Sequence, residues 1–129
     1  MKKLVFLLLF GMLAIGCSKS DDKSFWEQLQ SAPSVSISKK NLPNWLIDKI
    51  NQYEEQYANQ LSMINVKIYK GKWKNHTLYY LSDKFDSCLL CSVFYDNGKQ
   101  LVLNNDSEVN NFVTTSKNWV LIYEIGTEL

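Results

Sequence analysis

The hydrophobic pattern of the chain predicts one long helix followed by strands. From about Pro43 to Gln60, apolar residues recur at spacings of three and four, which indicates an amphipathic helix. Proline suits the first helical position, because the N–H that it lacks would have no partner there. The apolar stripe comprises Leu46, Ile50, Tyr53, Tyr57 and Leu61. We expect this helix to lie across a sheet.

The apolar period then changes to two, which predicts strands. Residues 64–69 and 77–81 form the first predicted hairpin, with a bend at residues 71–72 and a turn at residues 75–76 between them. Before the long helix, residues 35–38 also alternate, so that segment is a candidate edge strand.

A second hairpin is predicted from residues 88–95 and 99–103, with a turn at Asp96-Asn97-Gly98 between them. Asn-Gly readily supplies the positive φ angles of a type I′ turn, and this makes it the strongest hairpin signal in the chain.

Two short helices and a last strand complete the pattern. Ser24 with Glu27, and Asn105 with Glu108, have the spacing of a capping box and each predict a helix start. Residues 119–125 are apolar on both faces until Glu124. A strand that is apolar on both faces is buried on both, so we expect it at the centre of the sheet.

Together these elements predict an α+β fold. We expect the N-terminal helix to pack on a mainly antiparallel sheet of about four to five strands, with a short second helix before the last strand. Residues 42–129 would form this single domain, residues 17–41 a lead-in, and residues 1–16 a separate N-terminal segment.

The N-terminal segment has the three parts of a signal peptide. Lys2 and Lys3 are followed by an apolar run over residues 4–15, and Gly16 is the small residue before the cleavage point. The run is too short for a membrane-spanning helix, which needs roughly 20 apolar residues.

Residues 13–17, Leu-Ala-Ile-Gly-Cys, resemble the lipobox of bacterial lipoproteins, although Ala14 stands where leucine is usual. The resemblance implies that Cys17 carries a thioether-linked diacylglycerol and an acylated amino group, and that palmitate-type chains anchor the protein to a membrane. The alternative is an ordinary secretory signal, with no lipid on Cys17.

Residues 18–23, Ser-Lys-Ser-Asp-Asp-Lys, are polar and predict a flexible tether. With Cys17 they also resemble the acidic export signal of lipoproteins of the Bacteroidota, which implies an outer-membrane location, on the periplasmic or the outer side. A plain solvated spacer is the alternative.

The charge of the chain argues against nucleic-acid binding. All 14 basic residues are lysine, and loss of residues 1–16 leaves 12 of them against 13 acidic residues. Arginine provides the planar fork that recognises phosphate and guanine. A near-neutral chain without arginine therefore predicts no nucleic-acid partner.

Cys88 and Cys91 form the one Cys-x-x-Cys pattern. Outside the cytosol two such thiols tend to pair, so a local disulfide is expected. Two free buried thiols, or a redox or metal role, are the alternatives. In a regular strand positions i and i+3 point to opposite faces, so a bridge here needs a turn or a bulge.

The sequence offers little catalytic chemistry. His76 is the only histidine and stands in a polar turn, and no nucleotide-binding, hydrolase or metal-binding motif is present, so we expect no cofactor, metal or catalytic residue. The aromatic residues are more suggestive. Trp73 with Tyr79 or Tyr80 could form an outward platform for a glycan or a protein partner.

The Leu-Pro-Asn-Trp-Leu segment at residues 42–46, the following strand, Tyr79-Tyr80 and the Tyr-Asp-Asn-Gly turn resemble a group of small uncharacterised lipoproteins of the Bacteroidota. The resemblance covers roughly residues 42–125 and implies location and fold but no activity. We therefore expect a non-enzymatic binding module held at the outer membrane, with an envelope protein as its partner. Binding of glycan or peptidoglycan fragments, or inhibition of a hydrolase, is the alternative.

Overall fold

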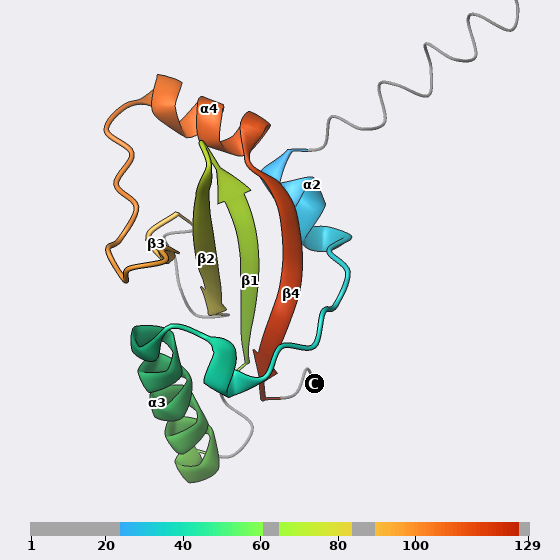
Figure 1. The fold of residues 1–129 in the computed structure, drawn as a ribbon, viewed down its shortest axis with the longest axis vertical. Coiled ribbons are helices and arrows are strands. Elements are labelled where there is room, and N and C mark those ends of the chain that lie inside the picture. The colour runs from blue at the N-terminus through green and yellow to red at the C-terminus, as the bar shows by residue number, and fades with distance from the viewer. Residues whose placement is uncertain (1–23, 61–64, 84–89, 127–129) are drawn as a thin grey trace, which may run out of the picture.

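The computed structural model describes residues 24–60, 65–83 and 90–126, which form an α+β fold (Figure 1). The helices are α2 (Phe25–Gln30), the 3-10 helix η2 (Lys39–Asn41), α3 (Asn44–Gln60) and α4 (Asp106–Thr115). The strands are β1 (Val66–Trp73), β2 (His76–Asp83), β3 (Val93–Tyr95) and β4 (Lys117–Ile125). They form an antiparallel sheet in the order β3-β2-β1-β4. The predicted fold class is confirmed: helices pack on the sheet, and the short helix α4 precedes the last strand.

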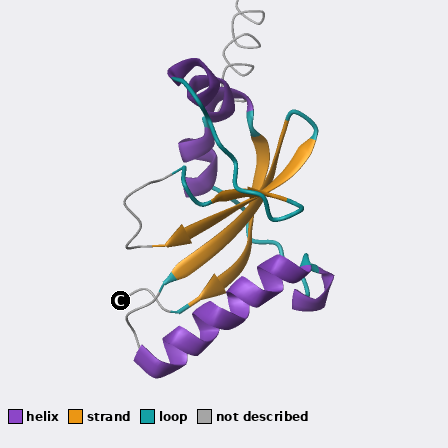
Figure 2. Ribbon diagram, turned by 90° about the vertical axis from the view of Figure 1, so that its left-hand side faces the viewer, coloured by secondary structure: helices purple, strands orange, loops and turns teal. Residues whose placement is uncertain are grey.

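The helices cover opposite faces of the sheet, α3 at one end and α2 with α4 at the other (Figure 1, Figure 2). Because neighbouring strand residues point to opposite faces, the core divides into two clusters. The cluster under α3 comprises Leu42, Leu46, Ile50, Val66, Ile68, Tyr79, Leu81, Ile122 and Ile125. The cluster under α2 and α4 comprises Phe25, Tyr69, Trp73, Leu78, Tyr80, Val93, Leu101, Phe112 and Trp119.

The helix starts follow the predicted capping pattern. In α4 the Asn105 side chain accepts a hydrogen bond of 2.9 Å from the N–H of Glu108, and in α2 the Ser24 side chain accepts one of 3.4 Å from the N–H of Glu27. Each bond satisfies an N–H that has no partner within its helix. The long helix is confirmed to residue 60.

The turn between β1 and β2 differs from the prediction. β1 continues through residues 71–72, with a shift of its register against β4 between Lys70 and Lys72, and the chain reverses over Lys74 and Asn75, whose φ angles are +49° and +65°. Two central residues with positive φ are the signature of a type I′ turn, whose twist suits a hairpin. Gly71 does not form a bend. Its missing side chain leaves room for the Trp119 ring, which a Cβ at this position would approach to 2.3 Å.

The second predicted hairpin is shorter than expected. β3 contains only residues 93–95, and residues 99–103 form no strand: they return through a single bridge between Phe94 and Gln100. Gly98 has φ +90° but Asn97 has no positive φ, so the expected type I′ turn is wrong. The N–H of Gly98 instead donates to the carbonyl of Tyr95 over 2.9 Å, which closes a four-residue turn from Tyr95 to Gly98.

β4 lies at the end of the strand order, so its predicted central place is wrong. Its faces are nevertheless covered by helices on both sides, which explains its apolar sequence. The lead-in protects its outer edge, because the N–H of Leu121 donates to the carbonyl of Pro33 and the N–H of Val35 to that of Leu121. This contact is one parallel bridge at Ser34, not the edge strand predicted at residues 35–38.

Candidate functional site

The three aromatic residues predicted to form an outward platform lie in the core. Trp73, Tyr79 and Tyr80 are 5%, 3% and 5% exposed, so their ring faces offer no surface for stacking a ligand. Tyr79 points toward α3, and the other two point toward α2 and α4. The predicted platform is therefore wrong, because helices cover both faces of the sheet where these residues lie.

The polar atom of Trp73 is also engaged inside the protein. Its indole Nε1 donates to Asn111 Oδ1 and Thr115 Oγ1 of α4, each over 3.1 Å. Tyr80 stacks on Tyr69 with ring centroids 6.1 Å apart. These contacts join α4 to the sheet and leave neither ring available to a partner.

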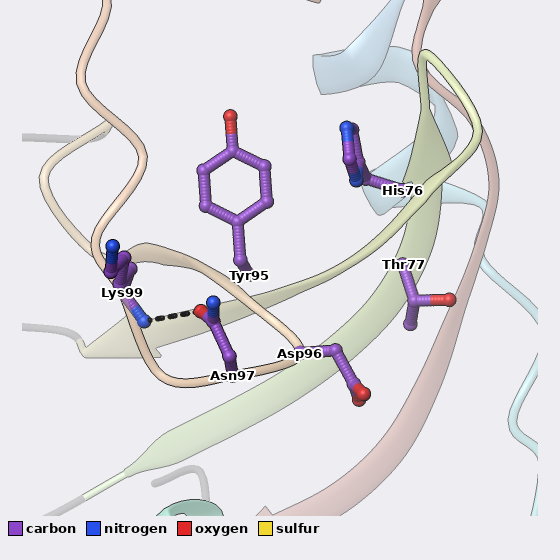
Figure 3. Close-up of a pocket in the computed structure, with 6 residues that line it drawn as sticks. All are labelled: His76, Thr77, Tyr95, Asp96, Asn97 and Lys99. Carbon is purple, nitrogen blue, oxygen red and sulfur yellow. Dashed lines mark hydrogen bonds between the residues drawn. The ribbon is translucent and has the colours of Figure 1, made fainter.

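A shallow cavity of about 380 Å³ lies at the edge of the sheet, where β2 extends past the end of β3 (Figure 3). β3 pairs with β2 only from Leu78 onward, so His76 and Thr77 have no partner in β3. The cavity is lined by His76, Thr77, Tyr95, Asp96, Asn97 and Lys99. It combines two exposed or half-buried rings with an amide, a carboxylate, a hydroxyl and an ammonium group.

The rings of His76 and Tyr95 form one side of this cavity. Tyr95 pairs with Leu78, and His76 lies two residues before Leu78, so the two side chains share a face of the sheet. Their centroids are 5.4 Å apart and their planes meet at 82°, an edge-to-face contact. Thr77 and Asp96 point to the other side of the sheet edge (Figure 3).

The turn over residues 95–99 is held from several directions. The Trp45 indole Nε1 on α3 donates to the carbonyl of Asp96 over 2.8 Å. The N–H of Lys99 donates to Asn97 Oδ1 over 3.0 Å, and a Cβ on Gly98 would lie 3.0 Å from the Trp45 ring. Contacts from α3 and within the turn therefore fix the cavity before any ligand arrives.

Tyr79 supports the turn from beneath. Its hydroxyl donates to Asp96 Oδ1 over 3.4 Å. Burial, and secondarily the charge of Asp96, raise the pKa of Tyr79 to about 12. The phenol therefore stays protonated at neutral pH and remains a donor to the Asp96 carboxylate.

Cys91 lies in the exposed turn before β3 and is disulfide-bonded. The other two cysteines, Cys17 and Cys88, lie outside the described residues, so the pairing of Cys88 with Cys91 stays a prediction. Because Cys91 is exposed and disulfide-bonded, the alternative of two free buried thiols is wrong for this residue. The Cys91 carbonyl accepts a hydrogen bond of 2.7 Å from Gln100 Nε2, which fastens this turn to the segment after Gly98.

Within residues 24–60, 65–83 and 90–126, no three His, Cys, Asp or Glu side chains are grouped as a metal site would require. In the same ranges no helix has the length and apolar character needed to cross a membrane. Cys17 and the tether lie outside these ranges, so acylation stays a prediction.

Comparison with known proteins gives no relative: no protein family, curated protein or solved structure matches the chain. The geometry of the cavity must therefore carry the functional interpretation.

The sequence pattern did not indicate the residues that line this cavity. The sequence predicts only that His76 stands in a polar turn and that Asp96-Asn97-Gly98 forms a turn, and it assigns a binding role to neither. A signal was nevertheless present: Tyr95 directly precedes a polar turn, and an aromatic residue at such a place faces solvent when its strand is short.

Proposed function

We propose that this protein is a lipid-anchored, non-enzymatic binding module of the outer membrane and that the cavity at the edge of β2 is its binding site. The observation that carries the proposal is the accessible His76–Tyr95 ring pair beside a turn that α3 holds in place. A preformed site loses little conformational entropy on binding, which favours capture of a ligand.

The chemistry of the cavity favours a saccharide as the ligand. A sugar ring presents C–H groups on its faces and hydroxyl groups around its rim. The Tyr95 ring can contact the C–H face, and the Asn97 amide and the Lys99 ammonium can bond the hydroxyls. The proposed glycan site is therefore formed by His76 and Tyr95 in place of Trp73, Tyr79 and Tyr80.

The binding test uses His76 as a reporter, because the sole histidine gives unambiguous imidazole NMR signals. We expect peptidoglycan and lipopolysaccharide oligosaccharides, added in turn to the full-length protein in detergent, to shift these signals with at least one of them. The shift should vanish in Tyr95→Ala and persist in Tyr57→Ala, a matched loss of a half-buried tyrosine on α3. Unchanged His76 signals across the panel, or an equal response in Tyr95→Ala, would contradict the proposal.

The anchor is tested separately by growing cells with radiolabelled palmitate. We expect label in the wild type and none in Cys17→Ser. Absence of label from the wild type would remove the anchor but leave the cavity proposal intact.

A further inference from the structure

A row of lysines occupies the part of the sheet that α3 leaves uncovered. Along β1, on the face toward α3, Ile68 is fully buried, Lys70 is half-buried and Lys72 is exposed. Figure 1 shows the reason: α3 crosses only the end of the sheet remote from α4. The exposed end of this face therefore carries Lys70 and Lys72 of β1 together with Lys117 of β4.

Two of these lysines face each other directly. Lys72 and Lys117 are register partners in the β1–β4 ladder, and like charges at such positions destabilise a sheet. At the other end of the same ladder Lys67 lies opposite Glu124, the arrangement that favours pairing. The unfavourable pair is thus confined to the uncovered end.

Among the described residues no acidic side chain forms an ion pair with these three lysines. The side chains of Lys70, Lys72 and Lys117 have no hydrogen bond or ion pair within the described part of the chain. Lys74, in the β1–β2 turn at the same end of the sheet, adds a charge beside this row; its Nζ lies 4.5 Å from the centre of the Trp73 ring, on the side toward α2 and α4. An anionic surface is the partner that such a cluster of lysines would attract.

The chain enters the domain at this same end. Gln28 Nε2 of α2 donates over 2.8 Å to the carbonyl of Ser116, the residue before Lys117. Only residues 18–23 separate Cys17 from Ser24, so seven residue steps join their Cα atoms, and a fully extended chain of that length spans at most about 25 Å. A lipid on Cys17 would therefore hold the lysine end of the sheet close to the bilayer.

We propose that the end of the sheet that carries Lys70, Lys72 and Lys117, with Lys74 in the adjoining turn, faces the membrane, contacts anionic lipid headgroups and thereby orients the anchored domain. This proposal rests on the proposed anchor. The cavity at His76 and Tyr95 is a separate site, lined by none of these four lysines. Electrostatic attraction of lysines near an anionic surface is additive over a few residues and is weakened by salt.

The experiment places the acylated protein, residues 17–129, in vesicles of either zwitterionic lipid or zwitterionic lipid mixed with an anionic phospholipid. An amine-acetylating reagent is added, and mass spectrometry follows the labelling rate of each lysine. In anionic vesicles we expect Lys72 and Lys117 to react several-fold more slowly than in zwitterionic ones. High salt should remove the difference, and Lys40 near α3 should react equally in both.

A pair of double variants provides the matched control. Lys72→Gln with Lys117→Gln should bring the labelling of Lys74 in anionic vesicles up to its zwitterionic rate, whereas Lys40→Gln with Lys49→Gln should not. Flotation of the vesicles reports the anchor independently. Protein that fails to float contradicts the proposed anchor, and the present proposal with it. Protein that floats but shows equal labelling of Lys72 in both vesicle types overturns the membrane-facing surface alone.

Discussion

Replacing Gly71 by alanine should destabilise the domain strongly, although it adds only one methyl group. A Cβ at this position would lie 2.3, 2.6 and 2.6 Å from three atoms in the middle of the Trp119 ring system. Carbon atoms pack at about 3.5–4.0 Å, so the indole would have to move by more than 1 Å, on the order of a bond length.

The indole has little room to move. Its ring lies 5.0 Å from that of Phe25 and 6.3 Å from that of Phe112, both fully buried. Its Nε1 donates over 3.0 Å to Ser116 Oγ, which is itself buried. Overpacking of this kind costs about 1–3 kcal/mol, and loss of the buried hydrogen bond adds roughly 1–3 kcal/mol. We therefore expect Gly71→Ala to lower the free energy of unfolding by about 2–6 kcal/mol.

Urea unfolding followed by far-UV circular dichroism measures this change. The double variant with Trp119→Val removes the ring, so the added methyl should then cost much less, with a coupling free energy above about 1.5 kcal/mol. If Gly71→Ala unfolds within about 0.5 kcal/mol of the wild type, the close approach of Trp119 to β1 is wrong.

Two further predictions concern the turn support and the α4 cap. Since the pKa of Tyr79 is raised to about 12, the fold favours the neutral phenol; this stabilisation is complete below pH 10 and is lost as pH rises toward 12. Between pH 9 and 12 the free energy of unfolding, measured by urea titration, should fall by about 2–3 kcal/mol more in the wild type than in Tyr79→Phe. If the free energies of the two proteins fall in parallel, Tyr79 is not the group responsible. Asn105→Ala removes the acceptor for the N–H of Glu108 and should cost about 0.5–2 kcal/mol, measured by thermal unfolding; Asn104→Ala, one residue outside the cap, should change the melting temperature little.

The helices could be predicted from the sequence because their signals are local. The capping side chains of Ser24 and Asn105 lie three residues from the N–H groups that they bond, and the stripe through Leu46 and Ile50 depends only on helical spacing. No distant contact has to be known to place such elements.

The turns could not be assigned in the same way. Asn97-Gly98 has the better type I′ sequence, yet Lys74-Asn75 adopts that turn. The choice depends on register: pairing of Trp73 with His76 leaves two residues for the reversal, and both must accept positive φ.

The proposed binding site could not be predicted from the sequence, because exposure of an aromatic side chain is a tertiary property. Tyr80 and Tyr95 both lie in strands with the same alternation. Tyr80 is buried against Phe25 of α2, whereas Tyr95, at the edge of the sheet, is only half-buried. Phe25 and Tyr80 are far apart in the sequence, so a local pattern does not show that Phe25 buries Tyr80.

The bonds between Pro33, Val35 and Leu121 have a consequence for biosynthesis. They join a segment near the beginning of the described chain to the strand made last, and β4 also supplies the partner of β1. Trp119 belongs to one core cluster and Ile122 and Ile125 to the other, so neither layer can close until β4 has left the ribosome. During synthesis the segment before α3 and the hairpin of β1 and β2 therefore wait for their partner strand, so the sheet is completed late.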